Sequence, residues 1–256
     1  MGEHSGRYAE TAVALCRAGF AVYANDHRGH GLTAAEGNAL GDFGIGGFEA
    51  VVADLAAVTK LIREEHAGTP VFLLGHSMGS FAAQIYMLDH ADAIAGLVLS
   101  GTAALDLRRE ALSKQNWTLE SNNAQFEPSR TSFDWLTRVA AAVDAYIADP
   151  LCGFTVTPES LRSMHAACGR ASRKEELSRV RSDLPILLIS GDSDPVNGNL
   201  VWLHPLVERL RAAGIRDVSV KIYPGGRHEL LNEIDRETVL ADLCAWIDRV
   251  CLSISY

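Results

Sequence analysis

The segment Gly75-His76-Ser77-Met78-Gly79 constrains the fold and the chemistry of this chain more than any other segment. It follows an apolar run at residues 71–74 and precedes a helical pattern at residues 81–88. A strand, a G-x-S-x-G turn and a helix in this order form a nucleophile elbow, whose strained turn holds the serine hydroxyl above a sheet. The two glycines should leave room for the helix to pass close to the strand. We therefore predict that Ser77 is a catalytic nucleophile rather than a structural serine in a tight turn.

Strand-like and helix-like segments alternate along most of the 256 residues. Strands are predicted at residues 20–24, 71–74, 94–99, 185–189 and 218–223, and helices at residues 8–18, 47–66, 81–89, 199–213 and 236–250. Alternating elements with continuous apolar strands are typical of an α/β fold, in which helices cover both faces of a mostly parallel sheet. A chain of this length suits one sizeable domain with a large core.

Residues 101–182 break this alternation, because they contain no convincing strand. The segment has polar residues at 115–116 and 121–123, and helical patterns at residues 134–148, 158–168 and 173–181. We predict that it is a helical cap, or lid, inserted into a core formed by residues 1–100 and 183–256. Ligands bind at the carboxyl end of such sheets, so a cap there would shape the pocket and exclude water.

A serine nucleophile needs a base to take its proton and a carboxylate to orient that base. Behind a nucleophile elbow the acid precedes the histidine in the chain. His228 lies in a glycine-rich loop after the strand at 218–223 and is the favoured base. Asp192 and Asp194 both follow the strand at 185–189, and we favour Asp194 because Asp192 can bond the amides of its own turn. The backbone N–H of Met78 should bind the oxyanion.

The composition excludes several classes of partner. The net charge of −9 argues against nucleic acid and against electrostatic docking on anionic lipid. No signal peptide or apolar run long enough to cross a bilayer is visible. The five cysteines are scattered and lack metal-site spacing, which favours reduced thiols. We expect a cytoplasmic protein, with at most a transient contact between its cap and a membrane surface.

The start of the chain, Gly2-Glu3-His4-Ser5-Gly6-Arg7-Tyr8, resembles a segment of the monoglyceride lipase and lysophospholipase group of α/β-hydrolases, which are serine aminopeptidase-like S33 hydrolases. The resemblance continues through Asp26-His27-Arg28-Gly29-His30-Gly31, the elbow, Asp194-Pro195 and Gly226-Arg227-His228-Glu229. It implies the α/β-hydrolase fold, with Ser77 as nucleophile, Asp194 as acid, His228 as base and Met78 as one oxyanion donor. It implies no metal and no organic cofactor. The implied substrates are monoacyl glycerides, lysophospholipids or simple esters.

The chain departs from this family at its beginning. Family members have a strand followed by H-G-x-G-E-H-S-G-R-Y, and here Met1 stands at the x, the position of the second oxyanion donor. The family also has a strand between those at 20–24 and 71–74. Without it, a slot with unpaired backbone groups would interrupt the sheet. We expect either that the two strands close up or that the sequence given is an incomplete version of a longer protein.

These features together predict a carboxylic ester hydrolase that works through an acyl-enzyme. The cap should supply an apolar acyl tunnel, and the pool of candidates is Leu105, Trp117, Phe126, Phe133, Trp135, Leu136, Tyr146, Leu151 and Phe154. Two alternatives stay open. The same fold carries aminopeptidase and acyltransferase chemistry. A chain lacking one oxyanion donor could also be a truncated, weakly catalytic or ligand-binding remnant.

Overall fold

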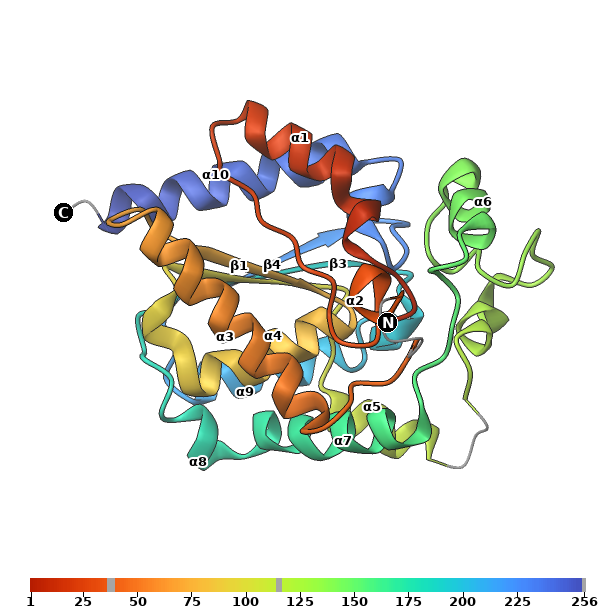
Figure 1. Cartoon of the computed structure of the whole chain (residues 1–256), viewed down its shortest axis with the longest axis horizontal. Helices are drawn as coiled ribbons and strands as arrows, with labels where there is room; N and C mark the ends of the chain where they lie inside the picture. The colour runs from red at the N-terminus through yellow and green to blue at the C-terminus, as the bar shows by residue number, and fades with distance from the viewer. Residues whose placement is uncertain (36–39, 114–116, 255–256) are drawn as a thin grey trace.

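The computed structural model describes residues 1–35, 40–113 and 117–254, and its four strands form one parallel sheet (Figure 1). The strand order is β1 (Phe72–His76), β2 (Gly96–Ser100), β3 (Ile186–Gly191) and β4 (Val218–Tyr223). Leu73 lies opposite Leu97, and Leu99 lies opposite Leu188. The predicted parallel sheet is therefore confirmed, and all four strands end at the same edge.

Helices cover both faces of this sheet, as predicted. The helices of the described residues are α1 (Ala9–Arg17), α2 (Gly31–Ala35), α3 (Gly47–Glu65), α4 (Met78–His90), α5 (Leu105–Leu112), α6 (Ala140–Ala148), α7 (Pro158–Cys168), α8 (Lys174–Leu177), α9 (Leu203–Ala212) and α10 (Arg236–Ile254). In Figure 1, α1 and α10 lie above the sheet, and α3, α4 and α9 lie below it.

The strand side chains alternate between two apolar cores because successive residues of a strand point to opposite faces. Val98 and Leu187 pack with the apolar face of α10, including Leu243 and Trp246. Leu97, Leu99, Ile186 and Leu188 belong to the other core, together with buried residues of α3, α4 and α9. Burial on both faces explains why the strands are apolar throughout rather than alternating in polarity.

Within the part of residues 101–182 that is described, the chain forms helices and turns and no strand. α7 packs against α3 and α4, while α6 lies off the side of the sheet toward which the strands point (Figure 1). The polar residues at 121–123 do not form an exposed loop as a group, because Asn122 and Asn123 are buried in a 3-10 turn, Glu120–Phe126. Residues 115 and 116 lie outside the described residues. The division of the chain into core and cap stays a prediction.

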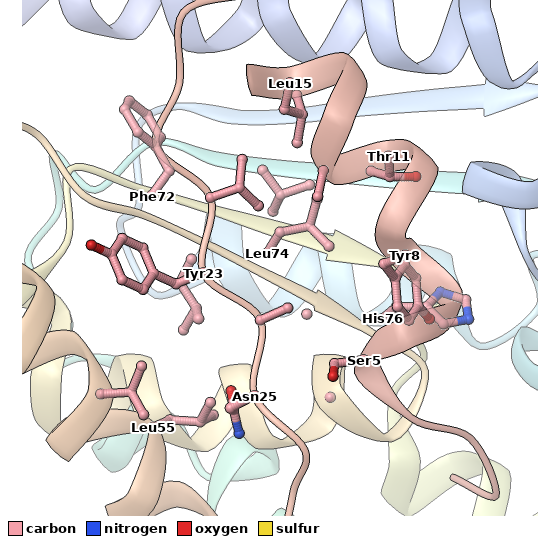
Figure 2. A pocket seen from close by; sticks show the side chains of 18 of the residues that line it. Ser5, Tyr8, Thr11, Leu15, Tyr23, Asn25, Leu55, Phe72, Leu74 and His76 are labelled. Atoms are coloured by element: carbon pink, nitrogen blue, oxygen red, sulfur yellow. The ribbon is translucent and has the colours of Figure 1, made fainter. Parts of the chain in front are cut away.

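The predicted strand at residues 20–24 is wrong, because this segment is extended but pairs with no strand of the sheet. Nor do the two segments close up. A cavity of about 420 Å³ lies between them, lined by residues 19–27 on one side and by residues 69–76 on the other. Figure 2 shows Tyr23 and Asn25 facing this space across from Phe72 and Leu74. β1 is therefore an edge strand that borders this cavity.

Candidate active site

The turn at Ser77 has the geometry expected of a nucleophile elbow. β1 ends at His76 and α4 begins at Met78, so one residue reverses the chain. Ser77 has φ 52° and ψ −120°, a conformation that is strained for a residue with a side chain. Its N–H donates to the carbonyl of Ser100 on β2 at 2.9 Å, and its carbonyl accepts from the hydroxyl of Ser80 at 2.6 Å. These bonds hold the strained turn in place.

The two glycines of the motif have different roles. A Cβ added to Gly75 would lie 2.4 Å from the carbonyl oxygen of Gly79 and 2.9 Å from the Cβ of Ala83, so the close approach of α4 to β1 requires glycine there. A Cβ added to Gly79 would meet nothing closer than His27, at 3.7 Å, which is ordinary contact. The expected need for glycine is confirmed at Gly75 and is wrong at Gly79. Gly79 contributes to the close approach through its backbone carbonyl, which lies against Gly75.

His228 and Asp194 meet although 34 residues separate them in the chain. Nδ1 of His228 lies 3.0 Å from Oδ1 and 3.1 Å from Oδ2 of Asp194. The same carboxylate accepts from the backbone N–H of Val196 at 2.8 Å and from the amide of Asn197 at 3.3 Å. Asp192 instead accepts from the backbone N–H of Gly225 at 2.8 Å. The structure thus brings Asp194, and not Asp192, to His228, as the sequence predicted.

Aromatic rings and one glycine position the imidazole of His228. The ring centroids of Trp135 and His76 lie 5.1 Å and 4.6 Å from that of His228. His76 bonds the hydroxyl of Ser100 through Nδ1 at 3.1 Å, as expected for a residue beneath the elbow. Gly101 lies directly against both imidazoles, since a Cβ there would come within 2.8 Å of the His228 ring.

Ser77, Met78 and His228 line one cavity of about 390 Å³. Asp194 occupies Nδ1 of His228, so Nε2 is the ring nitrogen left for the serine. Among the described residues, the hydroxyl of Ser77 and His228 form no hydrogen bond, a contact that often tightens only when substrate binds. Met1 lines the same cavity, and burial lowers the pKa of its amino group.

The segment at residues 2–8, which resembles the family motif, contacts Glu229, the residue next to His228. Arg7 donates to both carboxylate oxygens of Glu229, at 2.5 and 2.7 Å, and to Glu3 at 2.8 Å. Burial alone would raise the pKa of Glu3, but the amino terminus and Arg7 together lower it to about 2. A buried ion cluster therefore joins the start of the chain to the loop that holds the candidate base.

Part of the candidate pool for the acyl tunnel lines this cavity. The candidates that line it are Leu105, Trp117, Trp135, Leu136 and Tyr146, whereas Phe126, Phe133, Leu151 and Phe154 do not. The polar residues of the wall that the sequence did not indicate include Arg108 on α5, Asn122, and His165 on α7. His165 is half-buried. Periodicity offers no signal for them, because polar residues on a helix usually indicate its solvent-exposed face.

One grouping of metal-type ligands occurs in the described part of the chain, formed by His4, Asp149 and Cys152 within 4.8 Å of one another. Nε2 of His4 lies 2.8 Å from the carboxylate of Asp149, so these two side chains are already hydrogen-bonded to each other. Burial raises the pKa of the Cys152 thiol to about 12, so at neutral pH it is not the thiolate that metals bind. The residues present do not favour a metal centre.

Comparison with known proteins identifies the family. The model of the family described as serine aminopeptidase, S33, matches residues 1–235. This chain belongs to that family. The S33 chain also superimposes on the crystal structure of a thermostable carboxyl esterase from Bacillus coagulans with a TM-score of 0.86 and 30% identity, covering 98% of this chain and 87% of the esterase. Its fold is therefore the α/β-hydrolase fold.

The S33 chain has curated relatives over nearly its whole length. It is 30% identical to the monoacylglycerol lipase of Mycolicibacterium smegmatis, covering 96% of this chain and 84% of that protein. It is 30% identical to human monoglyceride lipase, covering 97% of this chain and 80% of the human protein. These relatives place the chain among esterase and lipase homologues. Within the described residues, no helix is both long enough and apolar enough to cross a bilayer.

Proposed function

We propose that this chain is a serine hydrolase that cleaves carboxylic esters carrying a single acyl chain, of the monoacylglycerol or lysophospholipid type. The observation that carries the proposal is the buried contact between Nδ1 of His228 and Oδ1 of Asp194, at 3.0 Å. His228 lines the same cavity as Ser77, which lies on its strained turn. The relatives named as monoacylglycerol and monoglyceride lipases support the substrate class.

In the proposed mechanism the hydroxyl of Ser77 attacks the ester carbonyl while Nε2 of His228 takes its proton. Asp194 holds the imidazole through Nδ1 and stabilises the positive charge that forms. The imidazolium then protonates the departing alcohol, which leaves an ester between the acyl group and Ser77. His228 next takes a proton from water, whose oxygen attacks this ester and releases the acid.

The oxyanion of each tetrahedral intermediate needs N–H donors. We assign one to the backbone N–H of Met78, which is the first residue of α4, where helical N–H groups have no partner within the helix. Met1 lines the same cavity, and we propose it as the position of the second donor. Losing one such donor costs about 10²–10³ in kcat, so one donor alone would leave measurable activity.

We further propose that residues 101–182 act as the cap of this site. The apolar wall formed by Leu105, Trp117 and Leu136 comes from this segment and would hold the acyl chain away from water. A substrate held in a membrane or micelle would enter the cavity beneath the cap. The proposed function therefore requires the cap to contact the lipid surface.

Labelling and a substrate panel test the proposal. A fluorophosphonate probe should label the folded protein, and Ser77→Ala should abolish the label while the thermal unfolding midpoint stays within a few degrees. Unlabelled, folded wild-type protein would instead indicate a ligand-binding remnant. A substrate panel then distinguishes ester hydrolysis from amide hydrolysis. It contains a monoacylglycerol, a lysophosphatidylcholine, short p-nitrophenyl esters and aminoacyl amides. Preference for the amides would indicate an aminopeptidase and overturn the ester assignment.

A further inference from the structure

Arg108 is a buried cation in the wall of the candidate active site. It lies on α5, lines the same cavity as Ser77, and is only 8% exposed. Among the described residues its guanidinium has no ion pair, and its buried Nε has no hydrogen-bond partner. Its Cζ lies 4.8 Å from the ring centroid of Trp117. A buried charge without a counter-ion is costly for folding, so its presence in a binding cavity calls for an explanation.

The acidic residues near the cavity already have partners. Glu3 and Glu229 both bind Arg7, and Asp194 binds His228. Asp106, on the same helix as Arg108, binds Arg209 at 2.7 Å. None of these carboxylates forms an ion pair with Arg108 among the described residues, although the nearby charge of Asp194 partly offsets the effect of burial on the pKa of Arg108.

The effect of this positive charge is visible on a neighbouring group. His165 on α7 lines the cavity beside Arg108 and its neighbour Arg109. Burial, together with the charges of Arg109 and Arg108, lowers the pKa of His165 to about 4. Burial also lowers the pKa of Arg108 itself to about 10, which still leaves the guanidinium charged at neutral pH. This end of the cavity thus carries an excess of positive charge.

Two further N–H donors of the wall lack acceptors. Asn122 accepts a hydrogen bond from Nε1 of Trp117 at 3.2 Å, which orients its amide so that Nδ2 is the free donor. Nδ2 of Asn122 and Nε1 of Trp135 are both buried and have no partner among the described residues. Arg108, Asn122 and Trp135 thus offer donors from three separate segments, and all three residues line the cavity.

We propose that the Arg108 end of the cavity is a binding subsite for an oxyanion group, a phosphate or a carboxylate, carried by the ester substrate. The inference rests on the proposed ester hydrolase function and narrows its substrate class to anionic esters. An anionic group there would neutralise Arg108 and accept from the unpartnered donors, whereas a purely apolar occupant would leave all of them unsatisfied.

Two pairs of substrates locate the anionic group. In the first pair the charge is on the leaving alcohol, and 1-decanoylglycerol is compared with 1-decanoylglycerol 3-phosphate. In the second pair the charge is at the far end of the acyl group, and p-nitrophenyl hexanoate is compared with the mono-p-nitrophenyl ester of adipic acid. We expect wild-type protein to have a roughly 10- to 100-fold lower KM for the anionic member of one pair. The pair that shows the difference identifies the source of the charge.

The variant Arg108→Met tests the residue itself. It should abolish the preference, because KM rises for the anionic substrate much more than for the neutral substrate. Because Arg108 has no ion pair in the free protein, the thermal unfolding midpoint of Arg108→Met should equal or exceed that of the wild-type protein. A structural role of Arg108 would instead lower the midpoint of the variant. Arg162→Met is the control, because Arg162 follows the cavity residue Leu161 on α7 but its side chain is 68% exposed and is not part of the cavity wall. It should retain the preference.

Equal KM values for both members of each pair in wild-type protein would overturn the proposal. So would an Arg162→Met variant that loses the preference as fully as Arg108→Met, since the charge would then act without a specific site. Fluorophosphonate labelling of Ser77 in the wild-type protein separates these outcomes from failure of the hydrolase assignment. Wild-type protein that is labelled but shows no substrate preference would contradict the subsite alone.

Discussion

The carboxylate of Asp194 lies 3.0 Å from Nδ1 of His228, and the two residues are 0% and 2% exposed. A carboxylate only accepts hydrogen bonds, so this contact places the proton of the neutral imidazole on Nδ1. Nε2 then carries the lone pair. The buried acid therefore sets the tautomer that a base acting on Ser77 requires.

The first prediction concerns this pair. Asp194→Asn should lower kcat for ester hydrolysis by about 10³–10⁴, because an amide can hold the imidazole in the wrong tautomer. KM should change little, since Asp194 is not part of the cavity wall. Asp192→Asn is the control, because the carboxylate of Asp192 accepts from Ser193 and Gly225 and forms no hydrogen bond with His228 among the described residues. Steady-state kinetics on a p-nitrophenyl ester measure both, and a comparable loss in Asp192→Asn would mean that the acid is misassigned.

The second prediction concerns the glycine beneath the imidazoles. Gly101→Ala would place a methyl group 2.8 Å from His228 and 3.0 Å from His76, at a position with φ +57°. The positive φ should cost about 1–2 kcal/mol of unfolding free energy, and the displaced His228 should lower kcat at least about tenfold. Gly68→Ala is a matched control, because Gly68 has φ +81° with no atom within 4 Å. It should lose similar stability and keep its activity.

The elements that the sequence predicted well are those whose pattern is local. The strand at 218–223 and the helix at 158–168 have the bounds predicted for them. The pairing of Asp194 with His228 was also predictable, because both follow parallel strands and the carboxyl ends of such strands share one edge. Apolar periodicity and chain order carry this information without any knowledge of the packing.

The errors have a different physical origin. Residues 20–24 have strand composition, but a strand exists only when its backbone bonds a neighbour, and no neighbour lies beside this segment. Arg108 was missed for a related reason. A cation on a helix indicates a solvated face in most proteins, and only the packing of α5 against the rest of the cavity wall shows that this one is buried. Both outcomes depend on contacts between residues distant in the chain.

A third prediction follows from the burial of His30, which is 3% exposed. Burial lowers its pKa to about 3, below the value of 6.5 for an unperturbed histidine. The unfolded chain therefore binds a proton below pH 6.5 that the folded protein does not bind. The stability that this histidine confers is complete above pH 6.5 and falls as the pH decreases toward 3, by up to about 1.4 kcal/mol per pH unit.

The variant His30→Phe isolates this contribution. A phenyl ring keeps the stacking on Phe43 but binds no proton, at the cost of the bond between Nδ1 and the carbonyl of Arg28. Urea unfolding at pH 7, 6, 5 and 4 should show a shallower loss of stability in the variant than in wild-type protein. Identical slopes would show that His30 takes up its proton in the folded state, contrary to its burial.

The last prediction concerns the edge of β1 beside the cavity in Figure 2. The backbone N–H of Ser77 donates to Ser100 on β2, and the carbonyl of Val71 accepts from Ala95, the residue before β2. Alternate residues of a parallel strand bond the same neighbour, so Leu73 also faces β2 whereas Leu74 directs its N–H toward the cavity. In hydrogen exchange followed by NMR, the amide of Leu74 should therefore exchange at least about 100-fold faster than that of Leu73, because only the latter must break a ladder bond to open. Leu73 and Leu74 are adjacent in one strand, so the comparison controls for global unfolding. Equal protection would mean that in solution the segment at residues 20–25 closes onto β1 and the cavity is filled.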